Sequence, residues 1–320
     1  MNGTNMGFEA FMTQSDNMQR VLRSAEKFAK LETPLLIEGE TGTGKDLLAT
    51  ACVEASPRGK QKFVAVNCAG LPNAEAESEM FGHGESENTA ASQGFFEYAN
   101  GGTVLLDGVT ELPLELQAKL LRFINDGTFR RVGEDQTHYA DVRVICTSQI
   151  PLWQAVQEGK LREDLYHRLN VLTLTIPPLR DRINDIPLLA DYFLAKIGQK
   201  LKRTFMPLDE AVCRKLQNYA WRGNGRELYN VLYRACSLNE TGTLTVGDVQ
   251  LVEEKFPLEN EVLDLPEQGL EEMMNHFEEK LLRHFYRQYP TTRKLASRLG
   301  ISHTAVANKL KQYGITKEKE

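Results

Sequence analysis

The sequence lacks long hydrophobic runs, a cysteine pattern for disulfides or metals, and a secretory leader. No apolar stretch of its 320 residues approaches the roughly 18 that a membrane-spanning helix needs, so no membrane association is expected. The first residues show no basic start followed by an apolar stretch, as a secretory signal would. The five cysteines are scattered without metal-ligand spacing, which indicates reduced thiols. These absences predict a cytoplasmic protein.

Positive charge is scarce in most of the chain and concentrated at its C-terminal end. The net charge is −6, which by itself argues weakly against a nucleic-acid partner. Residues 290–320, however, contain seven Lys or Arg and two Glu, a net charge of +5, so the preceding residues carry −11. An acidic body joined to a basic segment suggests a nucleic-acid module attached to another domain. With 41% hydrophobic residues, the body has ample material for a globular core.

Short apolar runs alternate with helical stretches in the first part of the chain. Buried-strand patterns occupy residues 34–38, 63–66, 103–106 and 142–145, and residues 114–125 have helical periodicity. Strands that alternate with helices predict an α/β fold, in which a parallel sheet is covered by helices on both faces.

The strand patterns stop after residues 177–178. Residues 186–200, 208–218 and 226–237 have helical spacing, which predicts a helical subdomain. Residues 251–268 contain two prolines and several acids and are predicted to be a linker. Beyond it, apolar side chains recur at three- and four-residue steps and predict one face of a helix: Leu270, Met273, Phe277, Leu281 and Phe285.

A glycine-rich motif follows the first predicted strand and opens a predicted helix. It fits the phosphate-binding pattern GxxxxGK, in which backbone N–H groups surround the phosphates while Lys45 reaches the outer ones. The next position holds Asp46 rather than the Ser or Thr that would contact magnesium. The alternative is a glycine-rich turn formed by chance, but the strand and the helix lie where a phosphate loop requires them. The predicted nucleotide-binding residues of this motif are Gly39, Glu40, Thr41, Gly42, Thr43, Gly44, Lys45 and Asp46.

An acidic residue ends the third predicted strand. Asp107 follows the apolar run 103–106 at the place where a nucleotide-binding fold holds magnesium. Acids often end strands, but downstream of a phosphate loop this one predicts a bound nucleotide with Mg²⁺ held at Asp107.

Residues 292–306 have the spacing of a helix-turn-helix. Ala296 is small where two helices would cross, Gly300 follows in the turn, and Val306 lies in the second helix, which Ser302 is placed to cap. The alternative is a plain helical hairpin with a basic face; the spacing and the local charge favour DNA binding. The expected core residues are Leu295, Leu299, Ile301 and Leu310. The outward-facing donors to bases or phosphates are His303, Thr304, Asn308 and Lys311.

A series of motifs resembles, in order, the central domain of bacterial enhancer-binding proteins, which are AAA+ ATPases that activate sigma-54 polymerase. The series includes ETGTGKD in the phosphate loop, VNCA after the second strand, FGH at residues 81–83 and GNGREL at residues 223–228. It spans roughly residues 8–250. The resemblance implies an AAA+ P-loop sheet with helices on both faces, a helical lid, and then a small all-α domain. The implied boundaries are 1–250 for the AAA+ domain (8–178 α/β, 179–250 lid), 251–268 for the linker and 269–320 for the helix-turn-helix domain.

The resemblance also implies roles for single residues. It assigns Lys45 and Asp107 to ATP and magnesium, and makes Asn67 the partner of a catalytic carboxylate. Arg226 would sense the γ-phosphate from the lid. Arg162 and Arg168 would reach the nucleotide of a neighbouring subunit, because a guanidinium grips phosphate oxygens in two places. Without the motif order, these arginines would be interpreted as surface ion pairs.

The chain departs from that family at two functional positions. Gly108 stands where the family has the Glu that orients the attacking water, and Glu111 lies three residues further on. ATP binding is therefore expected with slow or absent hydrolysis. The loop at residues 84–91 reads GESENTAA in place of the GAFTGA element that grips the sigma factor. Two smaller departures, Arg222 for Pro and Gly225 for Val, lie near Arg226.

The C-terminal segment, with TRKLASRLG followed by SHTAVANKL, is similar to that of TyrR-type regulators of aromatic amino-acid genes. This resemblance implies a repressor of aromatic biosynthesis and transport genes that works with housekeeping polymerase, with ATP and tyrosine or another aromatic amino acid as ligands. A homodimer on a palindromic operator of double-stranded DNA is expected, and a hexamer with ATP. The predicted DNA-contacting residues are Arg293, Lys294, Arg298, Ser302, His303, Thr304, Asn308 and Lys311.

Two other functions remain open from the sequence. An active AAA+ ATPase that activates sigma-54 polymerase is disfavoured by Gly108 and by the altered loop at residues 84–91. A nucleotide-dependent scaffold whose basic tail only solubilises it is disfavoured by the helix-turn-helix spacing.

Overall fold

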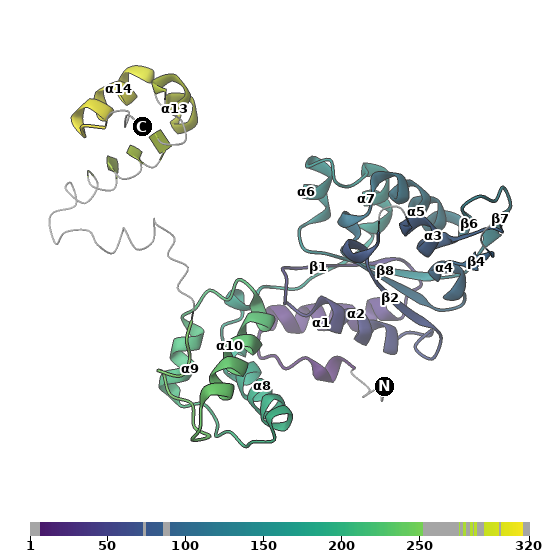
Figure 1. Ribbon diagram of the computed structural model, residues 1–320, viewed down its shortest axis with the longest axis horizontal. Coiled ribbons are helices and arrows are strands. Elements are labelled where there is room, and N and C mark those ends of the chain that lie inside the picture. Colours follow the sequence, from purple (N-terminus) through teal and green to yellow (C-terminus); the bar gives the residue numbers. More distant parts are fainter. Residues whose placement is uncertain are drawn as a thin grey trace. The chain divides into compact units, whose positions relative to one another are not determined.

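The structure, a computed structural model, describes residues 7–72, 75–85, 90–251, 291–300 and 302–315, together with positions 275, 278, 279, 282, 283, 285 and 286. The chain divides into two units, Met1–Leu251 and Val252–Glu320, which Figure 1 draws and which are considered separately below. The predicted linker at 251–268 lies almost wholly outside the described residues. Among the helices of the described part, none is long and apolar enough to cross a membrane.

A five-stranded parallel sheet organises the first unit. The strands β1 (Leu35–Glu38), β2 (Phe63–Asn67), β5 (Thr103–Asp107) and β8 (Arg143–Ser148) form at the four apolar runs that predicted them. The strand β9 (Leu172–Thr175) was not predicted, because its alternating Leu and Thr residues form no apolar run. The order β2-β5-β8-β1-β9 is that of a doubly wound sheet, in which β1 has a neighbour on each side.

Helices cover both faces of this sheet, as predicted. Side chains of a strand alternate between faces, so Leu35 and Ile37 pack with the helices α1 (Asp16–Ala29) and α2 (Lys45–Glu54), while Leu36 joins the core of the opposite face. Figure 1 shows α1 and α2 on one side of the sheet and α5 to α7 on the other. The helices of that second face are α3 (Ala76–Phe81), α4 (Phe95–Tyr98), α5 (Leu114–Asp126), α6 (Leu152–Gln157) and α7 (Glu163–Leu169).

Short elements connect the main ones. Two antiparallel pairs project from the sheet: β3 (Gly82–His83) with β4 (Ser92–Gln93), and β6 (Thr128–Arg130) with β7 (Thr137–Tyr139). Four turns of 3-10 helix are η1 (Phe8–Ala10), η2 (Cys68–Gly70), η3 (Val109–Glu111) and η4 (Leu179–Asp181).

The predicted helical subdomain contains α8 (Asp185–Leu201), α9 (Glu210–Gln217) and α10 (Asn224–Leu238). These bounds agree with the predicted stretches within two residues. The subdomain has its own core, in which Trp221 is fully buried and donates its indole N–H to Leu216 O at 2.6 Å. We refer to this subdomain as the lid, since it borders the pocket described below.

The second unit contains the predicted pair of helices, α13 (Thr292–Leu299) and α14 (His303–Gln312). Gly300 occupies the turn with a φ of +67°, a left-handed conformation that glycine adopts at little cost. Val306 and Leu310 pack against Leu295 and Ala296, as predicted, and Phe285 packs against the same core. Ile301, Leu270, Met273, Phe277 and Leu281 lie outside the described residues.

Candidate functional site

The glycine-rich motif forms the turn between β1 and α2. Gly42 and Gly44 have φ values of +78° and +105°, the left-handed region in which side chains are strained. A Cβ on Gly42 would lie 2.2 Å from Gly223 O in the lid. Only glycine therefore leaves room for the lid backbone to pack against this turn. The sequence required glycine here for the turn, and the structure adds the packing of the lid as a second reason.

Lys45 carries a buried positive charge at the start of α2. Its Nζ donates to Gly39 O at 2.7 Å and to Glu40 O at 3.1 Å, which places the ammonium inside the glycine-rich turn. Burial lowers the pKa of Lys45, and the nearby carboxylates of Asp107 and Asp46 oppose that shift. An ammonium in this position is suited to the phosphates of a nucleotide.

The end of β5 brings Asp107 to the same place. Its Oδ1 accepts a hydrogen bond from Thr147 Oγ1 at 2.5 Å, and the same hydroxyl oxygen accepts from the Gly108 N–H at 3.0 Å. Sequence reasoning missed Thr147, because it lies two residues beyond the predicted strand 142–145, within β8. Burial and the Asp107 charge raise the pKa of Asp46, which lines the pocket beside Lys45.

Asn67 lies next to Asp107 in the register of β2 and β5. Its side chain is exposed, and its Oδ1 accepts from the Ala69 N–H at 3.1 Å, which caps η2. Gly108 has a φ of +78° and a ψ of +54°, and no carboxylate projects from it. The site therefore brings Asn67, Asp107 and Lys45 together without the carboxylate that the family places at residue 108.

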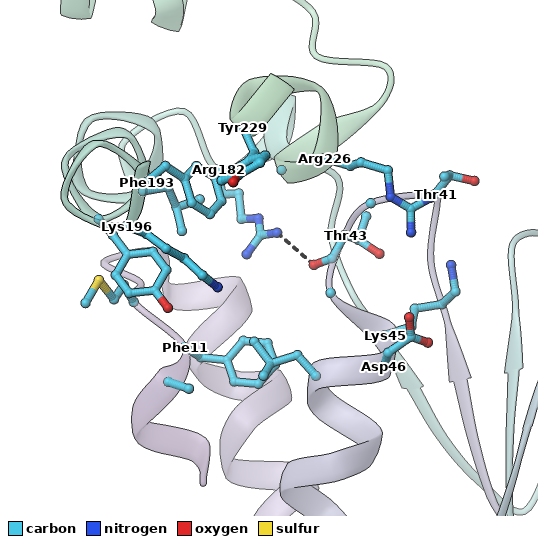
Figure 2. A pocket seen from close by; sticks show the side chains of 18 of the residues that line it. Phe11, Thr41, Thr43, Lys45, Asp46, Arg182, Phe193, Lys196, Arg226 and Tyr229 are labelled. Atoms are coloured by element: carbon cyan, nitrogen blue, oxygen red, sulfur yellow. Dashed lines mark hydrogen bonds between the residues drawn. The ribbon is translucent and has the colours of Figure 1, made fainter. Parts of the chain in front are cut away.

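A cavity of about 560 Å³ lies over the glycine-rich turn and is closed on one side by the lid (Figure 2). This volume is in the range of small-molecule sites. Its apolar lining residues are Phe11, Met12, Leu189, Tyr192, Phe193 and Tyr229. Its charged lining residues are Lys45, Asp46, Asp107, Arg182, Lys196 and Arg226, of which Lys196 lies near the aromatic side chains, with its Nζ 5.9 Å from the centroid of the Tyr192 ring. Apolar surface for a base together with cations for phosphates suits a nucleotide.

Two lid residues bind the glycine-rich turn directly. Asn224 is fully buried with a φ of +52°; its Oδ1 accepts from the Leu179 N–H at 2.7 Å and its amide donates to Thr41 O at 3.0 Å. The Gly225 N–H donates to Gly42 O at 3.0 Å. Asn224 belongs to the GNGREL motif, but the sequence assigned it no role, because the contact joins segments more than 180 residues apart.

Glu40 receives two further partners. Arg180 donates to both carboxylate oxygens of Glu40, at 2.8 and 2.5 Å, and Asn224 donates to Oε2 at 3.2 Å. The Arg180 guanidinium holds the pKa of Glu40 below its ordinary value. Glu40 was predicted as a nucleotide-binding residue; the structure places its side chain in contact with the lid.

The two predicted trans-acting arginines lie outside this cavity. Arg162 is exposed and pairs with Asp164 at 2.8 Å. Arg168 is exposed and donates to Ile124 O at 3.2 Å. Neither lines the pocket of its own chain. This placement is the one that a role at a neighbouring subunit would need.

The altered loop at residues 84–91 begins and ends at the β3–β4 pair. His83 fixes its base: Nδ1 lies 2.9 Å from the hydroxyls of Ser78 and Ser92, and Nε2 lies 2.9 Å from Ala90 O. Residues 86–89, which would form the tip, lie outside the described residues.

The helix-turn-helix unit exposes most of the predicted DNA-contacting side chains. Ser302 Oγ accepts from the Ala305 N–H at 3.1 Å and caps α14, as expected. The side chain of Arg298 lies outside the described residues. The other predicted DNA-contacting residues are exposed: Arg293, Lys294, Ser302, His303, Thr304, Asn308 and Lys311.

One basic residue of α14 is neutralised within the unit. Lys309 pairs with Glu278 at 2.5 Å, and Tyr313 Oη donates to the same carboxylate at 2.7 Å. This contact raises the pKa of Tyr313 to about 12. Lys309 therefore takes part in the internal contacts of the unit. In the described part of the unit, exposed positive charge for DNA is carried by residues such as Arg293, Lys294 and Lys311.

Family models match three parts of the chain. The Sigma-54 interaction domain matches residues 11–175, the AAA+ ATPase lid domain residues 180–255, and a Helix-turn-helix domain residues 267–316.

Curated relatives match nearly the whole chain. The HTH-type transcriptional regulatory protein TyrR of Haemophilus influenzae is 56% identical over 315 residues, which cover 97% of this chain and 96% of that protein. The TyrR protein of Salmonella typhimurium is 47% identical over 312 residues, but these cover only 60% of its length.

Solved structures agree with the fold. NtrX from Brucella abortus, in complex with ATP, is 30% identical and has a TM-score of 0.70, over 98% of this chain and 71% of that chain. A RuvB mutant of Thermotoga maritima, 15% identical with a TM-score of 0.54, shares the fold alone.

Proposed function

The chain belongs to the TyrR-type helix-turn-helix regulators, which carry a Sigma-54 interaction domain, and we propose that it acts mainly as a repressor of aromatic amino-acid biosynthesis and transport genes. It is a DNA-binding transcriptional regulator with a nucleotide-binding AAA+ domain. The target genes are inferred from the TyrR relatives. The role of the nucleotide is inferred from the combination of a phosphate-binding end, formed by Lys45 and Asp107, with Gly108 where a water-positioning carboxylate would stand.

The nucleotide is ATP with Mg²⁺, and it serves as a bound ligand rather than as a substrate for rapid hydrolysis. The carboxylates of Asp107 and Asp46 line the cavity beside Lys45, and oxygen donors next to a phosphate site suit magnesium. Mg²⁺ would be held by Asp107 and by the phosphates, and would neutralise their charge. Binding without rapid turnover leaves the nucleotide in place as a control on assembly.

Each of the two units supports its own mode of self-association. The exposed Arg162 and Arg168 would reach a neighbour's nucleotide in an ATP-dependent hexamer. One helix-turn-helix reads only a few base pairs, so a homodimer would place two recognition helices about 34 Å apart on a palindromic operator.

The recognition helix in this proposal is α14. Val306 and Leu310 face the core, so the opposite side of the helix is left for DNA. Base contacts are assigned to Thr304 and Asn308 on this side and to His303 at the exposed N-terminal end of the helix. Ser302 is the N-cap, and Lys311 lies near the C-terminal end. Phosphate contacts are assigned to Arg293, Lys294 and Arg298.

Tyrosine or another aromatic amino acid as effector, and housekeeping polymerase as partner, are supported by the family resemblance alone. The second candidate function is activation of sigma-54 polymerase, which the match of residues 11–175 to the Sigma-54 interaction domain favours. The GESENTAA sequence of the loop at residues 84–91 argues against it.

A gel-shift assay tests the proposal, using a palindromic operator and random DNA with and without ATP and tyrosine. We expect specific binding that ATP and tyrosine together strengthen. Asn308→Ala should relax discrimination at one base position by about 1–3 kcal/mol. Gln61→Ala, which removes an exposed amide in the first unit, is the matched control. Equal weakening of operator and random DNA by Asn308→Ala would show that α14 is not the recognition helix.

A further inference from the structure

Arg182 occupies the junction between the sheet and the lid. It follows η4 and is only 7% exposed. Its Nη2 donates to Thr43 O, in the glycine-rich turn, at 3.2 Å. Figure 2 shows its side chain extending from the lid toward Thr43 above the cavity that it helps to line.

The charge of Arg182 is incompletely satisfied. Its Nε is buried and has no hydrogen-bond partner within the described residues. Burial lowers its pKa, and Asp185 opposes that shift. A buried guanidinium N–H without an acceptor costs free energy, so an acceptor that enters the cavity would be bound favourably.

The charges around the cavity indicate which acceptor this is. The lining contains four cationic side chains, Arg182, Lys45, Lys196 and Arg226, against two carboxylates, Asp46 and Asp107. An anionic ligand would compensate the excess of positive charge. A phosphate oxygen is a strong acceptor for a guanidinium, because the bond is assisted by both charges.

The carboxylate of Asp185, three residues after Arg182, is already engaged by other donors. Asp185 is fully buried and accepts from Thr13 Oγ1 at 2.7 Å, from the Gln14 N–H at 2.6 Å and from the Ser15 N–H at 3.2 Å. The four residues from Arg182 to Asp185 therefore contact both the glycine-rich turn and the segment that precedes α1.

We propose that Arg182 is a second lid arginine for the nucleotide, whose unpartnered Nε–H binds a phosphate oxygen while Nη2 stays on Thr43. Nucleotide binding then fixes the sheet–lid junction, and through Asp185 it fixes residues 13–15. This role is separate from that of Arg226, which reaches the cavity from α10. The inference rests on nucleotide binding in the proposed function.

The sharpest test observes the Arg182 Nε–H in the unaltered protein. In a ¹⁵N-labelled chain, this signal is assigned through bonds from its own backbone amide. It is then followed during titration with adenosine, AMP, ADP, ATP and inorganic tripolyphosphate. We expect ADP and ATP to shift the signal and to slow its exchange with water, and adenosine to leave it unchanged. An unchanged signal at saturating ATP, or an equal shift with adenosine, would overturn the assignment to phosphate.

A charge-conserving variant gives an independent readout. Arg182→Lys keeps the charge but loses Nε, and we expect about tenfold weaker ATP binding in calorimetry with unchanged adenosine binding. Arg214→Lys is the matched control, because Arg214 is an exposed lid arginine paired with Glu210. Native ATP affinity in Arg182→Lys would contradict the inference and leave the proposed function intact.

Two further outcomes distinguish failure of the inference about Arg182 from failure of the proposed function. If the unaltered protein binds no ATP, the proposed function fails and the inference fails with it. If Arg182→Lys does not fold, as its melting temperature without nucleotide would show, the Nε–H titration of the unaltered protein decides.

Discussion

Substitution of Gly108 tests directly why this chain is expected to bind ATP without hydrolysing it rapidly. Gly108→Glu restores the carboxylate that the enhancer-binding family has at this position, next to Asp107 at the end of β5. Gly108 has a φ of +78° and a ψ of +54°, so any side chain there costs about 1–2 kcal/mol of backbone strain. The new Cβ would lie 3.5 Å from Glu111 Cγ, an ordinary contact, so no steric penalty adds to the strain.

Gly108→Ala is the matched control, because it carries the same strain without the carboxylate. Both variants should melt a few degrees below the unaltered chain, at roughly 2–4 °C per kcal/mol for a domain of this size. Phosphate release measures turnover. We expect the unaltered chain to stay below about 1 per second, the lower end of typical enzymes, and Gly108→Glu to exceed Gly108→Ala.

Two results would refute this reasoning. Equal turnover in Gly108→Glu and Gly108→Ala would show that a carboxylate at residue 108 does not position water in this site. Brisk turnover by the unaltered chain would show that another group does so. Glu111→Gln would then be the next variant, since the Glu111 N–H already donates to Gly108 O at 2.9 Å.

Three further predictions concern the same unit. Lys45→Ala should abolish ATP binding in calorimetry, because the buried ammonium in the glycine-rich turn is lost, while the exposed Lys60→Ala should bind normally. Asn224→Ala should lower the free energy of unfolding by about 1–3 kcal/mol, because the Leu179 N–H loses its acceptor; a denaturation midpoint equal to that of the unaltered chain would contradict this. The chain should form no open complexes with sigma-54 polymerase, because residues 84–91 lack the GAFTGA element; open complexes detected by footprinting would show that this loop still engages the sigma factor.

Local patterns in the sequence predicted four of the five strands of the parallel sheet, the main helices, and the motifs of the nucleotide and DNA sites. Apolar runs marked β1, β5 and β8, since a strand buried on both faces needs no polar residues. An apolar run also marked β2, although β2 is an edge strand and is partly exposed. The glycine-rich turn and the strand-ending Asp107 identified the phosphate end of the cavity, because both are set by backbone geometry over a few residues. The helix-turn-helix followed from spacing, and its cap at Ser302 formed as expected.

Contacts between distant segments were decided only by the tertiary structure. Asn224 meets Thr41, and Asp185 meets residues 13–15, across more than 160 positions of sequence. No periodicity or motif encodes such a pairing, because it depends on how the lid packs against the sheet. The same holds for Arg182, which looks like a surface arginine in the sequence and becomes a buried, partly unpaired cation over the cavity. The sequence determined which groups can bind a nucleotide. The packing of the lid against the sheet determined which lid residues line the cavity in which it would bind.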